Sequence, residues 1–117
     1  TIVATGHLVW ESLLAAAELE KEGISCEVIN IHTIKPLDEE IILNSVKKTG
    51  KIVTAEEHNI LGGLGESVAR VLAQKLPTKQ AFVAVEDKFG ESGTPSDLMK
   101  KYGIDSTAVI QKVKSLL

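Results

Sequence analysis

Val53-Thr-Ala-Glu56-Glu57-His58-Asn-Ile-Leu-Gly62-Gly63-Leu-Gly65-Glu66-Ser-Val68 is the stretch of the sequence that decides the fold. Its first residues predict a strand, its glycines predict a tight loop, and the apolar spacing that follows has a helical period. Two carboxylates and a histidine therefore come at the carboxyl end of a strand, just before the free N–H groups of a helix start. In open α/β sheets this edge is where ligands or partner surfaces bind.

The segments on either side repeat the same strand-then-helix order. Strands are expected over residues 2–5, 24–28, 51–55 and 81–85. Helices are expected over Leu8–Lys21, from Asp38 to a stop at Gly50, from Leu64, from Thr94-Pro95-Ser96-Asp97 and from Asp105-Ser106-Thr107. Gly23 is expected to end the first helix. The apolar faces read from the helical period are Trp10, Leu13, Leu14 and Ala17; Ile41, Ile42 and Val46; Leu64, Val68, Val71 and Leu72; and Val109, Ile110, Val113 and Leu116.

Strands and helices that alternate with short connections predict a parallel sheet with helices on both faces. We expect one domain over residues 1–117, an α/β fold with three α/β/α layers and a mainly parallel sheet of four strands in the order 2-1-3-4. In that order His7 follows strand 1 and Glu56, Glu57 and His58 follow strand 3, so both groups are expected at one crevice.

Composition excludes several classes of function. The 117 residues carry a net charge of -3 and only 3% aromatic residues, which disfavours binding to nucleic acid. No apolar stretch approaches the ~18 residues of a membrane span. Cys26 is the only cysteine and lies in an apolar pattern, so we expect a buried, inert thiol and a cytoplasmic protein. The chain opens directly on a strand, which suggests a piece of something longer.

The glycines do not form a nucleotide-binding motif. Only Gly6 follows strand 1, and Val68 stands where the third small residue of a dinucleotide fingerprint belongs. We interpret Gly62, Gly63 and Gly65 as positions that permit positive φ or close backbone approach. A helix N-terminus at this point could also hold an anion, such as a partner's carboxylate.

The acidic cluster has alternative interpretations. Glu56 and His58 are expected on one side of the strand and Glu57 on the other. His7, Glu56 and His58 could in principle bind a metal, but a polar cluster that contacts another domain is favoured. His32 is interpreted as structural. The loop of residues 88–93 contains Phe89 and is either an interaction loop or a flexible connection. No catalytic, cofactor-binding or metal-binding residue is assigned. The candidate interdomain or anion-contact residues are His7, Glu56, Glu57, His58, Gly62, Gly63, Gly65 and Phe89.

Taken in order, several landmarks resemble the C-terminal domain of transketolases. They are Ile2-Val-Ala-Thr-Gly6, Val28-Ile-Asn-Ile-His-Thr-Ile-Lys-Pro36-Leu-Asp38, Thr54-Ala-Glu56-Glu57-His58 with Gly62-Gly63-Leu-Gly65, Phe89-Gly90-Glu-Ser92-Gly93 before Pro95, and Lys101-Tyr102-Gly103-Ile104-Asp105. They cover nearly the whole chain.

The resemblance implies a C-terminal, non-catalytic module of an enzyme of the pentose phosphate pathway that moves a two-carbon ketol unit between sugar phosphates. Thiamine diphosphate and a divalent metal such as Mg would bind in the parent enzyme, between its N-terminal and middle domains, and not in this chain. The expected partners are those domains or a subunit that carries them, in a homodimer, with no nucleic acid and no membrane. The module would support domain packing and dimer assembly and would be inactive alone. The family also usually has an extra antiparallel strand ahead of the one at Ile2.

Three alternatives stay open from the sequence. One is a free-standing, flavodoxin-like module that binds an anion or a small molecule. Another is the equivalent domain of deoxyxylulose-phosphate synthase or of a 2-oxoacid dehydrogenase beta subunit. The third is a purely dimerising domain.

Overall fold

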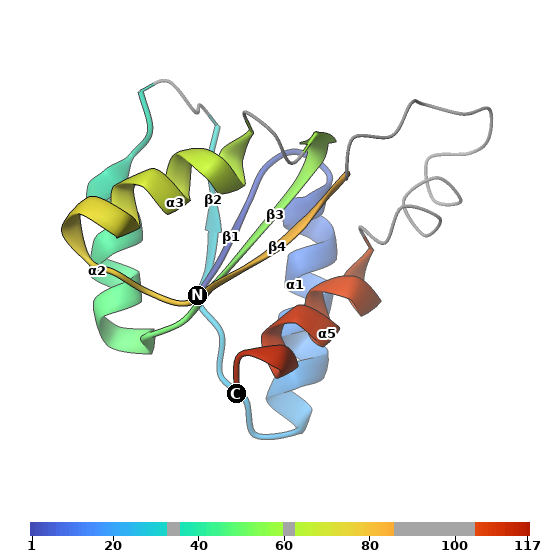
Figure 1. Cartoon of the computed structure of the whole chain (residues 1–117). Helices are drawn as coiled ribbons and strands as arrows, with labels where there is room; N and C mark the ends of the chain where they lie inside the picture. The colour runs from blue at the N-terminus through green and yellow to red at the C-terminus, as the bar shows by residue number, and fades with distance from the viewer. Residues whose placement is uncertain (33–35, 60–62, 86–104) are drawn as a thin grey trace.

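A computed structural model of the chain describes residues 1–32, 36–59, 63–85 and 105–117 (Figure 1). Its elements are β1 (Ile2–Ala4), α1 (Leu8–Lys21), β2 (Val28–Asn30), α2 (Glu39–Thr49), β3 (Ile52–Asn59), α3 (Leu64–Lys75), β4 (Gln80–Val85) and α5 (Ser106–Ser115). The helix expected at Thr94, and the candidate residues Gly62 and Phe89, lie outside the described residues.

The four strands form one sheet in the order β2-β1-β3-β4, and every neighbouring pair is parallel. The predicted strand order is therefore confirmed. Strand β3 runs on to Asn59, so Glu56 and Glu57 lie within the strand and not after it. Strand β2 begins at Val28, and the prediction of a strand from residue 24 is wrong. Ile24 N–H still donates to the Leu19 carbonyl at 3.0 Å, so the chain there is still completing the end of α1.

Helices α1 and α5 cover one face of the sheet, and α2 and α3 cover the other (Figure 1). Each face has its own apolar core. The first contains Ile2, Ala4, Leu8, Ala15, Leu19, Val53, Ala55, Val83, Val109, Val113 and Leu116. The second contains Val3, Ile29, Ile31, Ile42, Val46, Ile52, Leu64, Val68 and Leu72. This is the three-layer α/β/α arrangement that the alternating pattern predicts.

The helix ends follow the local chemistry of the sequence. The Asp38 carboxylate accepts from Ile41 N–H at 3.3 Å at the start of α2, and the Asp105 carboxylate accepts from Ala108 N–H at 3.0 Å at the start of α5. A carboxylate in this position satisfies a donor that has no partner within the helix. Helix α2 stops at Gly50, whose φ of 76° is left-handed, as the sequence predicts.

The apolar face predicted for α1 is real but points outward. Trp10, Leu13 and Leu14 are 58%, 48% and 40% exposed, and Ala17 is exposed beside them. We call these four residues the α1 outer strip. The face that packs on the sheet consists of Leu8, Ser12, Ala15 and Leu19. Small residues at two of these four positions let the helix lie close to the sheet, a fact that a hydrophobic period does not reveal. Ile41 of α2 is likewise 46% exposed, although its neighbours Ile42 and Val46 are buried.

Ser12 provides a prediction about stability. Its hydroxyl is buried in α1, and no described group forms a hydrogen bond with it. Ser12→Ala is therefore expected to raise the free energy of unfolding by about 1 kcal/mol, because it removes an unpaired polar group and improves helix propensity. Urea unfolding followed by circular dichroism would measure it.

Ser45→Ala is the matched control. Ser45 is also a buried helical serine, but its hydroxyl donates to Glu27 Oε1 at 2.5 Å and lies 2.7 Å from Thr1 Oγ1. Its replacement is expected to destabilise the protein. A loss of stability in Ser12→Ala as large as that in Ser45→Ala would contradict the assignment of Ser12 as unpaired.

Candidate interdomain surface at the carboxyl edge of the sheet

Glu56 caps helix α3 from inside the protein. Its side chain is fully buried on β3. Leu64 N–H donates to Oε1 at 2.8 Å, and Gly65 N–H donates to Oε2 at 2.7 Å. These are the first residues of α3, whose N–H groups have no partners within the helix, and the positive end of the helix dipole lies there. Both carboxylate oxygens therefore hold the helix onto the strand.

Gly65 allows α3 to approach the sheet closely. A Cβ atom at this position would lie 2.4 and 2.5 Å from two ring carbons of Phe82 and 3.0 Å from Thr54 Oγ1. Gln80 closes the same contact, since its Nε2 donates to Thr54 Oγ1 at 3.1 Å and to the Gly65 carbonyl at 3.0 Å. Gly63, at the N-cap, is buried and extended, with φ of -95°. Close approach thus explains Gly65, and neither Gly63 nor Gly65 uses a positive φ.

Glu57 performs the corresponding task on the opposite face. Its Oε1 accepts from the His7 backbone N–H at 3.0 Å, at the start of α1. Gly6, with φ of 56°, makes the turn between β1 and α1 directly over this carboxylate. The structure therefore brings His7 and Glu57 together, as their positions after strands 1 and 3 predict. Glu56 contacts the helix on the other face of the sheet and does not join them.

A depression of about 410 Å³ lies beside Glu57 at the carboxyl ends of β1, β2 and β3. It is lined by Thr5, Gly6, Asn30, Ile31, His32 and Glu57. Its size is within the range of ligand sites. However, Glu57 places a carboxylate at the helix N-terminus, where an anion would otherwise bind. Thr5 and Asn30 were not singled out from the sequence, although their positions at strand ends are a signal for this edge.

The remaining candidate residues are described by the structure only in part or not at all. His58 lies on β3, but its side chain, like Gly62 and Phe89, is outside what the structure describes. His32 is exposed at the end of β2. Among the described side chains, no three of His, Cys, Asp or Glu come together as a possible metal site. No described helix has the length and apolar character that crossing a lipid bilayer would require.

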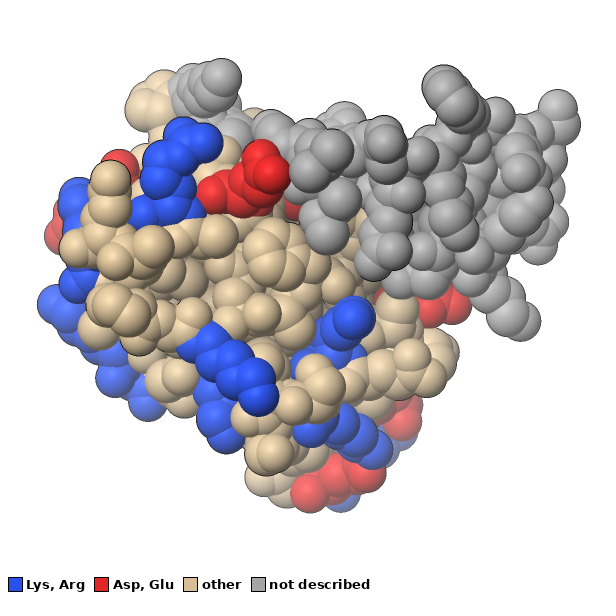
Figure 2. Space-filling view, in the orientation of Figure 1, with Lys and Arg blue, Asp and Glu red and all other residues tan. Residues whose placement is uncertain are grey.

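The surface charge is mixed on the face seen in Figure 2. Lys and Arg side chains surround an uncharged centre, and carboxylates lie near the upper and lower rims. Along the left edge of this view several Lys and Arg side chains lie near one another.

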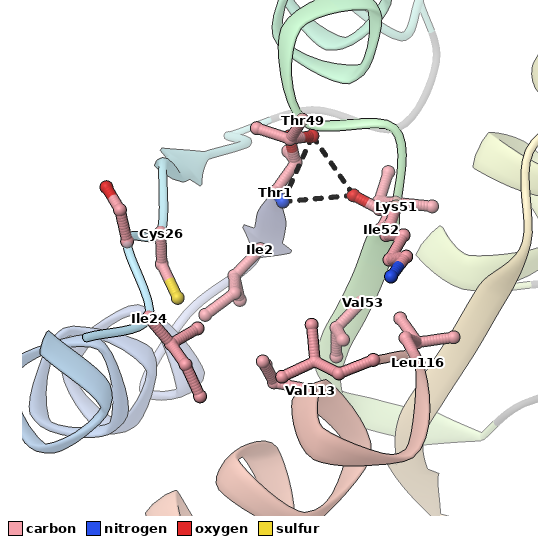
Figure 3. A pocket seen from close by; sticks show the side chains of 12 residues that line it. Thr1, Ile2, Ile24, Cys26, Thr49, Lys51, Ile52, Val53, Val113 and Leu116 are labelled. Atoms are coloured by element: carbon pink, nitrogen blue, oxygen red, sulfur yellow. Dashed lines mark hydrogen bonds between the residues drawn. The ribbon is translucent and has the colours of Figure 1, made fainter. Parts of the chain in front are cut away.

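Cys26 lies at the opposite edge of the sheet, in a pocket of about 80 Å³ near the amino ends of β1 and β3 (Figure 3). Its sulfur points toward Ile2 among apolar side chains that include Val113 and Leu116. Cys26 is only half-buried, so the prediction of a buried thiol is wrong in degree, but burial still raises the pKa of the thiol above its usual range. The pocket is too small for a cofactor, and the high pKa makes the thiolate scarce at neutral pH.

We therefore expect Cys26 to react slowly with a disulfide reagent such as dithionitrobenzoate. Labelling of the folded protein should be at least ~10-fold slower than labelling of the protein unfolded in urea. The pH at which the labelling rate increases should also be higher for the folded protein than for the unfolded chain. Stopped-flow absorbance measures both quantities. Equal labelling rates in the folded and unfolded states would show that the thiol is not shielded from the reagent and that its pKa is not raised.

These features define an α/β/α domain with a parallel sheet, whose most conspicuous ionisable residues hold its own helices in place. Residues 1–109 match the model of the transketolase C-terminal domain, and the chain belongs to that family.

Three relatives illustrate the family. The chain is 46% identical over 111 residues to a 6-deoxy-6-sulfo-D-fructose transketolase subunit, SqwH, of Clostridium sp. strain MSTE9, covering 95% of this chain and 34% of that protein. It is 43% identical over 114 residues to a putative transketolase C-terminal section of Methanocaldococcus jannaschii, covering 97% of this chain and 35% of that one. A solved structure described as a split-gene transketolase, an inactive beta4 tetramer, superposes with a TM-score of 0.94 at 44% identity, over 99% of this chain and 38% of the other. The chain thus spans about a third of the length of these relatives.

Proposed function

We propose that this chain is the C-terminal, non-catalytic module of a transketolase-type enzyme that transfers a two-carbon ketol unit between sugar phosphates. The module packs against the domains that carry thiamine diphosphate and its divalent metal, and it supports assembly of a homodimeric holoenzyme. The names of two relatives, a transketolase subunit and a C-terminal section, favour a chain that works together with a separate partner.

The observation that carries the proposal is that the Glu56 and Glu57 side chains accept hydrogen bonds from N–H groups at helix starts. Catalytic carboxylates need an approach for substrate or for a proton. Glu56 is fully buried, and Leu64 and Gly65 N–H groups donate to its two oxygens. Glu57 Oε1 accepts from the His7 N–H. Glu56 is thus closed to substrate, whereas Glu57 is exposed but has one oxygen engaged in joining α1 to the sheet.

A reconstitution experiment tests this function. The chain alone is expected to bind no thiamine diphosphate by isothermal titration calorimetry and to show no ketol transfer. Addition of the missing domains should give a complex that binds the cofactor and transfers the two-carbon unit between ketose and aldose phosphates. Tight binding of thiamine diphosphate by the isolated chain would overturn the proposal.

The sugar specificity is tested in the same reconstituted complex. One relative is named for 6-deoxy-6-sulfo-D-fructose, so the panel of donors should include that sulfosugar beside ketose phosphates. The panel should also include pyruvate and longer 2-oxoacids, which are donors for the related thiamine enzymes. Ketose phosphate as the preferred donor would support the transketolase assignment, and a 2-oxoacid would support the alternative.

The depression beside Glu57 favours one second candidate, a free-standing module that binds a small molecule. An anion is the weaker option for it, because carboxylates of this chain already accept the N–H groups at the starts of α1 and α3. Thermal-shift titration with phosphate and nucleotides tests the candidate. No shift at millimolar ligand would count against it.

A further inference from the structure

Helix α1 is apolar on two opposite sides. Its inner side, with Leu8, Ala15 and Leu19, is buried in the core of the domain. The α1 outer strip, with Trp10, Leu13, Leu14 and Ala17, has the spacing i, i+3, i+4, i+7 of a second helix-packing face. Because α1 has a second apolar side besides the one that packs on the sheet, this strip has the pattern of a surface that is covered in an assembly.

The strip is complementary to itself when two helices run antiparallel. If Leu13 and Leu14 of one copy pack against Leu14 and Leu13 of another, residue i faces residue 27−i, and Trp10 faces Ala17. The largest side chain of the strip then meets the smallest, which is what close packing of two helices requires. In a parallel pair Trp10 would face Trp10, and Ala17 would leave a gap opposite Ala17.

Electrostatics favour the same arrangement. None of the four strip residues is charged, so a contact confined to them buries no charge. The exposed Glu18, Glu20 and Lys21 lie at the C-terminal end of the strip, and Lys21 pairs with Glu18 at 3.1 Å. Antiparallel helices also place the positive end of one helix dipole beside the negative end of the other. The contact is isologous, and such a contact closes as a two-fold dimer instead of growing into a filament.

We propose that the α1 outer strip is a self-association surface that binds α1 of a second copy of this chain in antiparallel orientation. The inference deepens the assembly role of the proposed function, and rests on it, by naming the surface. Two helical turns bury less area than a standard protein interface, so the contact by itself is weak and adds to others in the holoenzyme.

Trp10 allows direct measurement, because it is the only tryptophan of the chain. Its fluorescence is expected to shift to shorter wavelength as the protein concentration rises toward millimolar, in parallel with an increase in weight-average mass by sedimentation. Leu13→Lys should raise the dissociation constant of the dimer at least ~10-fold, because it puts a charge at the centre of the contact. Ile41→Lys is the matched control, since Ile41 is 46% exposed and Leu13 is 48% exposed, and it should change neither signal.

Cross-linking tests the orientation. In a Cys26→Ser background, chains with Trp10→Cys mixed with chains with Ala17→Cys should form a disulfide-linked heterodimer, while Ala17→Cys alone should cross-link poorly. Efficient cross-linking of Ala17→Cys to itself would indicate a parallel pair and overturn the proposal. So would a wild-type chain that stays monomeric to millimolar concentration, or an equal effect of Leu13→Lys and Ile41→Lys.

Failure of this inference and failure of the proposed function give different results. If the strip contacts the thiamine-binding partner, wild type stays monomeric and Leu13→Lys weakens binding of that partner, which overturns the inference and leaves the function intact. If Leu13→Lys abolishes self-association but no partner restores ketol transfer to the wild-type chain, the surface is supported and the proposed function fails.

Discussion

Glu56→Ala is expected to lower the free energy of unfolding by about 3–4 kcal/mol. The change removes a buried carboxylate that accepts from Leu64 N–H at 2.8 Å and from Gly65 N–H at 2.7 Å. Hydrogen bonds to a charged group are each worth about 1.5–3 kcal/mol, and the two donors would stay buried without their acceptor. Truncation also leaves a cavity between β3 and α3.

Urea unfolding, followed by circular dichroism and by Trp10 fluorescence, measures this effect. Glu57→Ala is the matched control, because Glu57 also receives an N–H group at a helix start, at 3.0 Å, but its side chain is exposed. It should cost about 1 kcal/mol or less. Glu56→Gln keeps one acceptor and turns an amide donor toward the second N–H, so an intermediate loss is expected. Similar small losses for Glu56→Ala and Glu57→Ala would contradict the buried cap.

The burial of Glu56 argues against the direct docking role that the sequence predicts for this residue. A fully buried carboxylate reaches a partner only through the position of α3, so its loss should affect folding first. Glu57 and His7, which are exposed at the rim, remain the residues for which direct contact with another domain is proposed. Binding of the partner to Glu57→Ala and His7→Ala variants, compared with their stability, would separate the two roles.

The strand order could be predicted from sequence, whereas the orientation of α1 could not. Short strands that alternate with helices leave few topologies, and 2-1-3-4 is one of them. The hydrophobic period of α1 locates apolar stripes but does not tell which stripe faces the sheet. Trp10 and Leu13 look more like core than Ser12 and Ala15 do, yet the smaller pair is buried. The decision depends on how closely the helix must approach β1 and β3, which is a tertiary property.

The candidate site was predictable to a similar extent. Strand alternation already places Glu56 and Glu57 on opposite faces. It does not show that a helix begins on each face with N–H groups close enough to donate to these carboxylates. That depends on where α1 and α3 begin relative to β3. Gln80 and Phe82, which complete the packing around Gly65, were missed for the same reason, since nothing in a strand's own sequence indicates which helix residue crosses it.

Gly65→Ala is the second prediction with a large effect, and two physical effects of opposite sign decide it. Helix propensity alone predicts a gain of up to about 1 kcal/mol, because alanine is a better helix former than glycine. Packing predicts a loss, since the new Cβ would lie 2.4 Å from a Phe82 ring carbon and 3.0 Å from Thr54 Oγ1. Helix α3 cannot simply move away, because Glu56 holds the Gly65 N–H at 2.7 Å. Overpacking of this kind costs about 1–3 kcal/mol, and we expect a net loss of about 2 kcal/mol.

A double-mutant cycle separates the two effects. Phe82→Ala removes the ring and leaves only the 3.0 Å approach to Thr54 Oγ1, which the gain from helix propensity should offset, so Gly65→Ala in that background should no longer destabilise the protein. Ser67→Ala, another substitution on α3, controls for propensity alone. The interaction energy between positions 65 and 82 is therefore expected to exceed about 2 kcal/mol, well above the few tenths seen for independent sites. An additive cycle would mean that Gly65 serves some purpose other than the close approach of α3 to β4.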